Sequence, residues 1–142
     1  MQVEMDSMMY CGWMGFPRFY SLWTDDHVGD PAIGAKMLAA VTGIDRTMEE
    51  NVRSFEAVWT LERAIRVREG QRREHDSFID ATFETNKAWA SKEVFGKVLD
   101  EYYKTRGWAV DTGIPTRSQL EKLGMKDVAD DLAGKYGVRV PA

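Results

Sequence analysis

The residue with the clearest capacity for chemistry is Cys11, at the end of the stretch DSMMYC (residues 6–11). It is the only cysteine among 142 residues. A thiolate can act as a nucleophile or bind iron, but a nucleophile needs a nearby base and an iron–sulfur cluster needs three further thiolates. A lone cysteine among methionines is more often a small buried hydrophobic residue. From the residues of this chain alone, packing is therefore the favoured role of Cys11.

The chain offers few partners for a catalytic site. Its two histidines, His27 and His75, have no spacing that ties them to Cys11, and they form no HxxxH or HExxH zinc pattern. The sequence also contains no GxGxxG, Walker or GxSxG motif. We therefore assign no catalytic residue within this chain.

A cluster of arginines occurs in ERAIRVREGQRRE (residues 62–74). Its members are Arg63, Arg66, Arg68, Arg72 and Arg73. The rigid guanidinium fork suits phosphates and carboxylates, which would indicate an anion site. However, three glutamates are interleaved with the arginines, and Glu62 precedes Arg66 by one helical turn. We therefore expect an ion-pair face, exposed to solvent or at an interface.

The charge of the chain argues against nucleic acids and anionic membranes as partners. The net charge is −4 and the isoelectric point is near 5.2, whereas both partners require a basic surface. The segment TRSQLEKLGMKDVADDL superficially resembles a helix-turn-helix, but its second helix carries Asp127, Asp130 and Asp131. An ordinary helical hairpin is the better interpretation.

Nothing in the sequence predicts export or membrane insertion. It contains no run of 18 apolar residues, and MQVEMDSMM lacks the basic start and apolar stretch of a signal peptide. A single cysteine gives no disulfide framework, which fits a reducing compartment. We therefore expect a cytoplasmic protein.

Helical periodicity extends over almost the whole chain, with Gly and Pro at the breaks, so the predicted fold class is all-α. We expect a single irregular domain over residues 1–142, with about five to seven helices and no sheet. Capping boxes are predicted at Thr47 with Glu50 and at Thr116 with Gln119, and Ser91 is a further N-cap. The helices expected from these signals cover residues 1–14, 32–43, 47–70, 92–107, 117–124 and 126–137, with a loop and a short helix in 71–90.

The longest predicted helix, 47–70, carries a broad apolar stripe. Its members are Val52, Phe55, Trp59, Leu61 and Ile65. The chain also has five Trp and eight Met, which indicates large apolar faces, some of them meant for another domain or subunit. We therefore expect the isolated chain to self-associate.

Two segments resemble a specific family. The stretch LERAIRVREGQRREHD is similar to an ER.FN.REG..R..D segment of the tungsten-containing aldehyde ferredoxin oxidoreductases. The stretch VLDEYYKTRGWAVDTGIPTRSQLEKLGMKDVADDL is similar to their DEYY..RGWD..G.PT...L..LGL..VA..L ending. That family includes the tungsten subunit of the benzoyl-CoA reductases, an alternative as the nearer relative.

The resemblance implies roles for two residues near the start of the chain. In the family a DxxGLC element supplies the last cysteine ligand of a 4Fe–4S cluster, and its aspartate helps to hold the pterin of the tungsten cofactor. Asp6 and Cys11 have that spacing here. A thiolate is a soft ligand suited to iron, and a carboxylate accepts hydrogen bonds from pterin N–H groups. The resemblance therefore implies Cys11 as a cluster ligand and Asp6 as a cofactor contact.

The sequence also departs from the family. Met9 and Tyr10 replace the usual Gly-Leu, and SFIDATF stands where LP.R commonly follows the acidic element at 74–76. The family's CxxCxxxC triplet, its first pterin-binding segment and its N-terminal sheet domain have no counterpart in this chain.

Two hypotheses remain open. In the first, the chain is the C-terminal domain or a fragment of a tungsten-bispterin, iron–sulfur oxidoreductase acting on aldehydes or acyl compounds. Its partners would be the remainder of the enzyme or a companion subunit, with ferredoxin as electron partner. The isolated chain would bind none of these cofactors and would be inactive. In the second, the chain is a stand-alone helical interaction module that has lost the chemistry, which the Met9-Tyr10 replacement and a start at Met1 favour.

Overall fold

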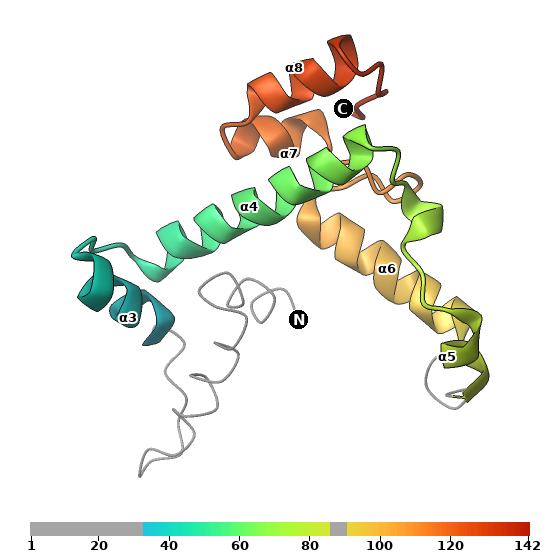
Figure 1. The fold of residues 1–142 in the computed structure, drawn as a ribbon, viewed down its shortest axis with the longest axis horizontal. Coiled ribbons are helices and arrows are strands. Elements are labelled where there is room, and N and C mark those ends of the chain that lie inside the picture. Colours follow the sequence, from blue (N-terminus) through green and yellow to red (C-terminus); the bar gives the residue numbers. More distant parts are fainter. Residues whose placement is uncertain (1–32, 86–90) are drawn as a thin grey trace. The chain divides into compact units, whose positions relative to one another are not determined.

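The described part of the chain is all-α, as predicted. The computed structural model describes residues 33–85 and 91–142. Within these ranges it contains six α-helices, one short 3-10 helix and no strand (Figure 1). An isolated antiparallel bridge joins Trp108 and Pro115. The first predicted helix, residues 1–14, lies outside the described residues.

The chain divides into two compact units, Met1–Trp59 and Thr60–Ala142. In the first unit, α3 (Ile33–Thr42) ends at Gly43, whose φ of 71° is the left-handed conformation that glycine adopts without strain. The predicted capping box at the start of the next helix is present. The backbone N–H of Thr47 donates to Glu50 Oε2 at 2.8 Å, and the backbone N–H of Glu50 donates to Thr47 Oγ1 at 3.1 Å.

The longest helix, α4 (Met48–Arg68), begins and ends close to the predicted bounds, but its buried face differs from the predicted apolar stripe. Leu61 and Ile65 of that stripe are 40% and 41% exposed. The buried positions on α4 are Asn51, Thr60, Arg63, Ala64 and Val67. From Thr60 onward the face that turns inward therefore carries an arginine, and part of the apolar stripe stays exposed.

Residues 71–85 form short elements, as expected. A single 3-10 turn, η2 (Arg73–His75), precedes the six-residue helix α5 (Asp80–Thr85). Phe83 of α5 packs with Phe78 and with Phe95, at ring-centroid distances of 6.1 and 5.8 Å. These ring contacts join α5 to the next helix.

Helix α6 (Lys92–Arg106) has both of its predicted ends. Ser91 Oγ accepts from the backbone N–H of Val94 at 3.2 Å, and Gly107 with φ 68° ends the helix. Its last turns bury Tyr103 and Arg106. A connection over 107–116 then leads to the last two helices.

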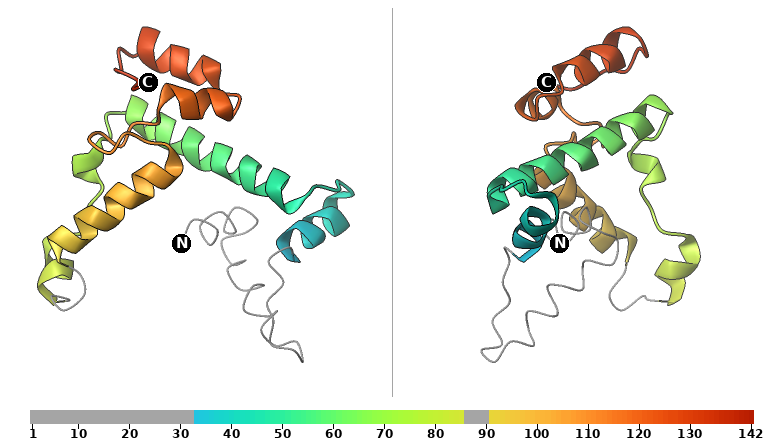
Figure 2. Two further views of the ribbon diagram at one scale, coloured as in Figure 1. Left: turned by 180° about the vertical axis from the view of Figure 1, so that it is seen from behind. Right: turned by 60° about the vertical axis from the view of Figure 1, so that its left-hand side comes forward.

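Helices α7 (Arg117–Lys122) and α8 (Lys126–Gly134) lie side by side as a short hairpin (Figures 1 and 2). The hydrophobic core of the second unit consists of Ala64, Val67, Ile114, Leu120, Ala129, Leu132 and Val138. The core thus brings the end of α4, the 107–116 connection and the C-terminal hairpin together. Asp130 on α8 accepts from Arg117 and Lys126, at 2.8 and 2.5 Å, so its charge is paired within the hairpin.

Only half of the capping box predicted at α7 is present. Thr116 Oγ1 accepts from the backbone N–H of Gln119 at 3.2 Å. The backbone N–H of Thr116, however, donates to the carbonyl of Gly107 at 3.1 Å, so it is not the donor for the Gln119 side chain that the motif requires. That side chain lies against Gly107 instead, where an added Cβ would approach it to 2.9 Å.

No helix in the ranges 33–85 and 91–142 is both long and apolar enough to cross a lipid bilayer. The single domain over residues 1–142 stays a prediction, and the two units are described separately.

Candidate functional site

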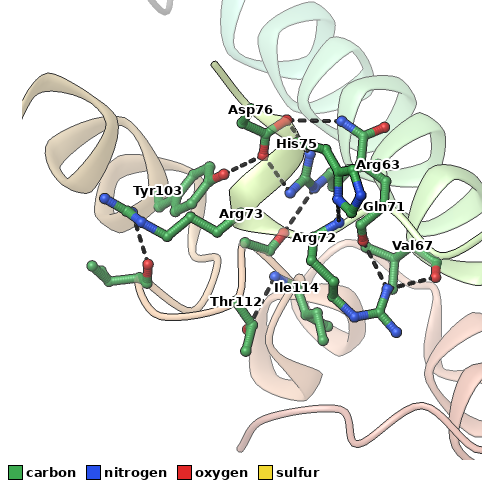
Figure 3. A network of polar contacts seen from close by, with 12 residues as sticks. Arg63, Val67, Gln71, Arg72, Arg73, His75, Asp76, Tyr103, Thr112 and Ile114 are labelled. Carbon is green, nitrogen blue, oxygen red and sulfur yellow. Dashed lines mark hydrogen bonds and ion pairs between the residues drawn. The ribbon is translucent and has the colours of Figure 1, made fainter. Parts of the chain in front are cut away.

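The most elaborate polar arrangement of the second unit centres on Arg63 and Asp76 (Figure 3). Arg63 lies on α4 and its side chain is 6% exposed, whereas Asp76 follows η2 and is 18% exposed. The two form a bidentate pair, with Nη1 to Oδ1 at 2.9 Å and Nη2 to Oδ2 at 2.6 Å. The geometry matches the planar fork of arginine to both carboxylate oxygens, which is the strong form of this contact.

Two further donors complete the surroundings of Asp76. Gln71 Nε2 donates to Oδ1 at 2.8 Å, and the hydroxyl of Tyr103 on α6 donates to Oδ2. Burial by itself would raise the pKa of Asp76, but the hydrogen bonds from Arg63, Tyr103 and Gln71 outweigh it and hold the pKa below its ordinary value of 3.8. Asp76 is therefore a carboxylate at neutral pH.

Tyr103 is the neutral partner in this arrangement. Burial, followed by its hydrogen bond to Asp76, raises the pKa of the phenol well above its ordinary value. The phenol therefore keeps its proton and donates it to the carboxylate. Because the phenol proton and the carboxylate are already engaged in this hydrogen bond, Tyr103 is a poor acid and Asp76 a poor base toward a substrate.

The third side of Arg63 faces the 107–116 connection. Its Nε donates to the carbonyl of Gly113 at 2.8 Å, so all three guanidinium nitrogens have an acceptor. The approach is close, since an added Cβ at Gly113 would lie 2.3 Å from Arg63 Nη2 and 2.8 Å from the Tyr103 hydroxyl. Gly113 also has φ 69°. Both its missing side chain and its backbone conformation are therefore required here.

Arg73 makes a second link between the same segments. Its Nη2 contacts Asp100 of α6 at 2.5 Å and its Nη1 donates to the carbonyl of Val110 at 2.8 Å. Its backbone N–H donates to the carbonyl of Thr112 at 2.9 Å. Its guanidinium also lies 5.4 Å from the centre of the Tyr103 ring, within cation–π range. Arg63 and Arg73 thus tie η2, α6 and the 107–116 connection to the end of α4.

These contacts refine the expectation of an ion-pair face, exposed to solvent or at an interface, over the arginine-rich stretch. The face exists only in part: Arg66 pairs with Glu62 at 2.5 Å on the surface, as predicted. Arg63 is instead buried and Arg73 partly buried, and both use backbone carbonyls as well as carboxylates. We name the set of Arg63, Asp76, Tyr103, Gly113 and Arg73 the arginine junction. Its role is structural, because it holds the end of α4, η2, α6 and the 107–116 connection together and offers no reactive group.

The sequence-predicted site residues are not among those the structure places. Asp6, Cys11 and His27 lie outside the described residues. His75 is exposed, and its Nδ1 accepts from the backbone N–H of Arg72 at 3.0 Å. Within 33–85 and 91–142, no group of three or more His, Cys, Asp or Glu side chains could hold a metal ion.

Reasoning from the sequence missed the partners of Arg63. Tyr103 and Gly113 are 40 and 50 residues away along the chain, and no local periodicity connects them to an arginine on α4. A signal was nevertheless present, because Arg63 and Asp76 both fall on the family-like ER…REG..R..D segment. An arginine on the inward face of a helix requires a carboxylate nearby, which would have indicated Asp76.

An apolar groove lies between α4 and α8. It has a volume of about 130 Å³ and is lined mainly by Leu61, Ala64, Ile65, Val128, Leu132 and Tyr136, with Arg68 and Asp131 completing its wall. Arg68 and Lys135 lie 5.6 and 5.3 Å from the centre of the Tyr136 ring.

Comparison with known families identifies the chain. The family model for aldehyde ferredoxin oxidoreductase, domains 2 and 3, matches residues 1–125. The chain belongs to the aldehyde ferredoxin oxidoreductase family. The match includes the arginine junction and also the stretch that carries Asp6 and Cys11.

A solved structure supports the same assignment. The chain is similar to a chain in the active-site complex BamBC of benzoyl coenzyme A reductase, determined with 1,5-dienoyl-CoA. The TM-score is 0.61 and the sequence identity 30%, and the match covers 75% of this chain. It covers only 16% of the other chain, so this chain spans a small part of the length of that relative.

Proposed function

We propose that this chain is the C-terminal part of a tungstopterin, iron–sulfur oxidoreductase that acts on aldehydes or acyl compounds in the cytoplasm. The observation that carries the proposal is the family match over residues 1–125, because it spans most of the chain. The similarity to a benzoyl-CoA reductase chain favours an acyl substrate, and ferredoxin is the electron partner that the family name indicates.

In this proposal Cys11 supplies one thiolate to a 4Fe–4S cluster and Asp6 accepts hydrogen bonds from the pterin. The donor chemistry fits, since iron–sulfur clusters are held by cysteine thiolates and a carboxylate suits the N–H edge of a pterin. One cysteine per chain means that three ligands come from the rest of the enzyme. When bound, the tungsten cofactor and the cluster supply the two-electron chemistry and the electron path.

The described helices contribute rigidity and one wall of the site. The arginine junction holds α6 and the 107–116 connection against the end of α4 through paired charges, so this part of the wall keeps one geometry. We assign no acid or base to it. Substrate binding and proton transfer then belong to the rest of the oxidoreductase.

The test is the Cys11→Ser variant in the assembled oxidoreductase, with Ser7→Ala as a control on a neighbouring side chain. We expect the wild type and the control to contain iron and tungsten and to show the electron paramagnetic resonance signal of a reduced 4Fe–4S cluster. Cys11→Ser should lose that signal and its iron, because oxygen is a harder ligand than thiolate. Wild-type cluster content in Cys11→Ser would contradict the role of Cys11.

A second function is favoured by one specific observation. Met9 and Tyr10 replace the Gly-Leu of the family pattern, which changes the backbone freedom next to Cys11. In this alternative the chain is a helical protein-interaction module without cofactors. An assembly purified through this chain that contains neither iron nor tungsten would favour the module over the oxidoreductase.

A further inference from the structure

The groove between α4 and α8 has apolar walls that nothing in the described chain covers. Three of its large side chains, Leu61, Ile65 and Tyr136, are 40%, 41% and 41% exposed. Side chains of this size are usually buried when they gather in one place, and an apolar concavity with a polar rim marks an interaction site. Its floor is formed by Ala64 and Leu132, which belong to the core.

The size of the groove indicates what it accepts. Its volume is about 130 Å³, whereas sites for cofactors or drug-sized ligands enclose ~300 Å³ or more. An apolar cavity of roughly 150 Å³ holds one benzene-sized molecule. The groove therefore fits a single large apolar side chain, which is how anchor residues occupy pockets in protein interfaces.

The walls of the groove are held in place before any partner binds. The Tyr136 ring lies within cation–π range of both Arg68 and Lys135, and the opposite wall belongs to the rigid helix α4. A preformed pocket reduces the entropy lost on binding. The groove therefore needs little rearrangement to accept an apolar side chain.

Resting on the proposed function, we infer that an apolar anchor side chain from the rest of the oxidoreductase occupies this groove. The related benzoyl-CoA reductase chain is much longer, since the match covers only 16% of it, and the matching family model is for domains 2 and 3. Most of a chain of that length lies outside the matched region, so a further protein segment is available to cover the face. The groove is the contact through which the α4–α8 pair is fixed to that segment.

Thiol labelling tests this contact. Ile65→Cys places a thiol in the groove, and Ala133→Cys places one on an exposed position of α8 that does not line it. Each variant is labelled with iodoacetamide as the isolated 142-residue chain and within the assembled oxidoreductase, whose iron and tungsten contents are measured in parallel. The wild type supplies the background from Cys11.

We expect the Ile65→Cys thiol to react at least about tenfold more slowly in the assembly than in the isolated chain, while Ala133→Cys changes by less than about threefold. Equal rates for Ile65→Cys in an assembly that contains iron and tungsten would overturn the inference and leave the proposed function standing. Equal protection of both thiols would overturn it as well, because the contact would not be specific to the groove. An assembly without iron and tungsten would overturn both proposals.

Discussion

The guanidinium of Arg63 lies in a nearly buried position, where each of its three nitrogens meets an acceptor. The cost of removing a charge from water is offset only while all of these partners stay in place. Asp76 depends on Arg63 in the same way, since its two oxygens accept four hydrogen bonds from three side chains. Changes to either residue should therefore be far more costly than changes to the surface ion pairs of this chain.

The substitution Asp76→Asn should lower the free energy of unfolding by about 3 kcal/mol, because it leaves the buried guanidinium of Arg63 without its counter-charge. Urea denaturation followed by circular dichroism measures this loss. Asp100→Asn serves as the control, since it removes the carboxylate of the more exposed Arg73 pair and should cost about 1 kcal/mol. Equal losses of unfolding free energy in the two variants would mean that the Arg63–Asp76 pair stabilises the fold no more than the Arg73–Asp100 pair does.

The stability of the chain should also depend on pH through Asp76. Its pKa in the folded chain lies below the ordinary 3.8, so its contribution is fully present above pH 3.8 and is lost as the pH falls through the lowered value. The difference in unfolding free energy between the wild type and Asp76→Asn should therefore shrink below pH 3.8. A constant difference from pH 6 to pH 2.5 would contradict the lowered pKa.

Gly113 is constrained by both space and backbone. Gly113→Ala should lower the free energy of unfolding by about 3 kcal/mol or more. The new Cβ would lie 2.3 Å from Arg63 Nη2 and would displace it, and alanine would be strained at φ 69°. Gly124→Ala isolates the backbone effect, since Gly124 has φ 81° but no described atom within 4 Å of an added Cβ. It should cost only about 1 kcal/mol. Thermal unfolding of both variants separates the two contributions.

At the scale of elements, the end of α6 and the start of α7 share one hydroxyl. Thr116 Oγ1 accepts from the backbone N–H of Gln119 and lies 2.9 Å from the carbonyl of Gly107, to which it donates. One residue thus satisfies a free donor at the start of one helix and an acceptor just after the end of another. The hydroxyl fixes the return of the chain at the base of the 107–116 connection.

Thr116→Ala should therefore lower the unfolding free energy by about 1–2 kcal/mol. Thr105→Ala is a suitable control, because Thr105 is exposed and its Oγ1 donates to the carbonyl of Glu101 within the same helix. That change should be close to neutral, since alanine is the better helix former. Chemical denaturation compares the two, and an equal loss in both would show that the shared hydroxyl adds nothing.

The helices themselves could be predicted well from the sequence, because their ends depend on local chemistry. Ser91, Gly43 and Gly107 lie at the ends where capping rules placed them. The inward face of α4 could not be predicted from hydrophobicity. Leu61 and Ile65 are as apolar as a core residue, but the side of the helix that carries Arg63 is the one that meets Asp76, and a bond between positions 63 and 113 has no local signal.

The most reactive residues of the candidate site, Asp6 and Cys11, were predicted from a family resemblance and not from local chemistry. The reason is that one thiolate has no functional context within its own chain. Their roles stay predictions. The arginine junction was hidden for the opposite reason, since its two arginines were visible in an arginine-rich run while their partners were scattered over the chain.

At the scale of the whole molecule, the chain corresponds to one part of a much longer related chain. It spans a small fraction of the related benzoyl-CoA reductase chain, and it has one cysteine where a cluster needs four ligands. The family membership and the exposed walls of the α4–α8 groove both favour a component of a larger assembly.

The purified 142-residue chain should therefore show no reduction of viologen dyes by aldehydes and no bound iron after anaerobic reconstitution. Colorimetric assays of dye reduction and metal analysis check both statements, with the assembled oxidoreductase as the positive control. Detectable turnover by the chain alone would contradict the view that it supplies only part of a site.

The link from Arg63 to Gly113 also has a consequence for synthesis on the ribosome. The two residues are 50 positions apart, and translation at ~5–20 residues per second takes on the order of 3–10 s to cover that distance. During this interval α4 can form, but Arg63 lacks the carbonyl that completes its surroundings. The end of α4 must therefore remain hydrated in the nascent chain, and its docking is deferred until the 107–116 connection has left the exit tunnel.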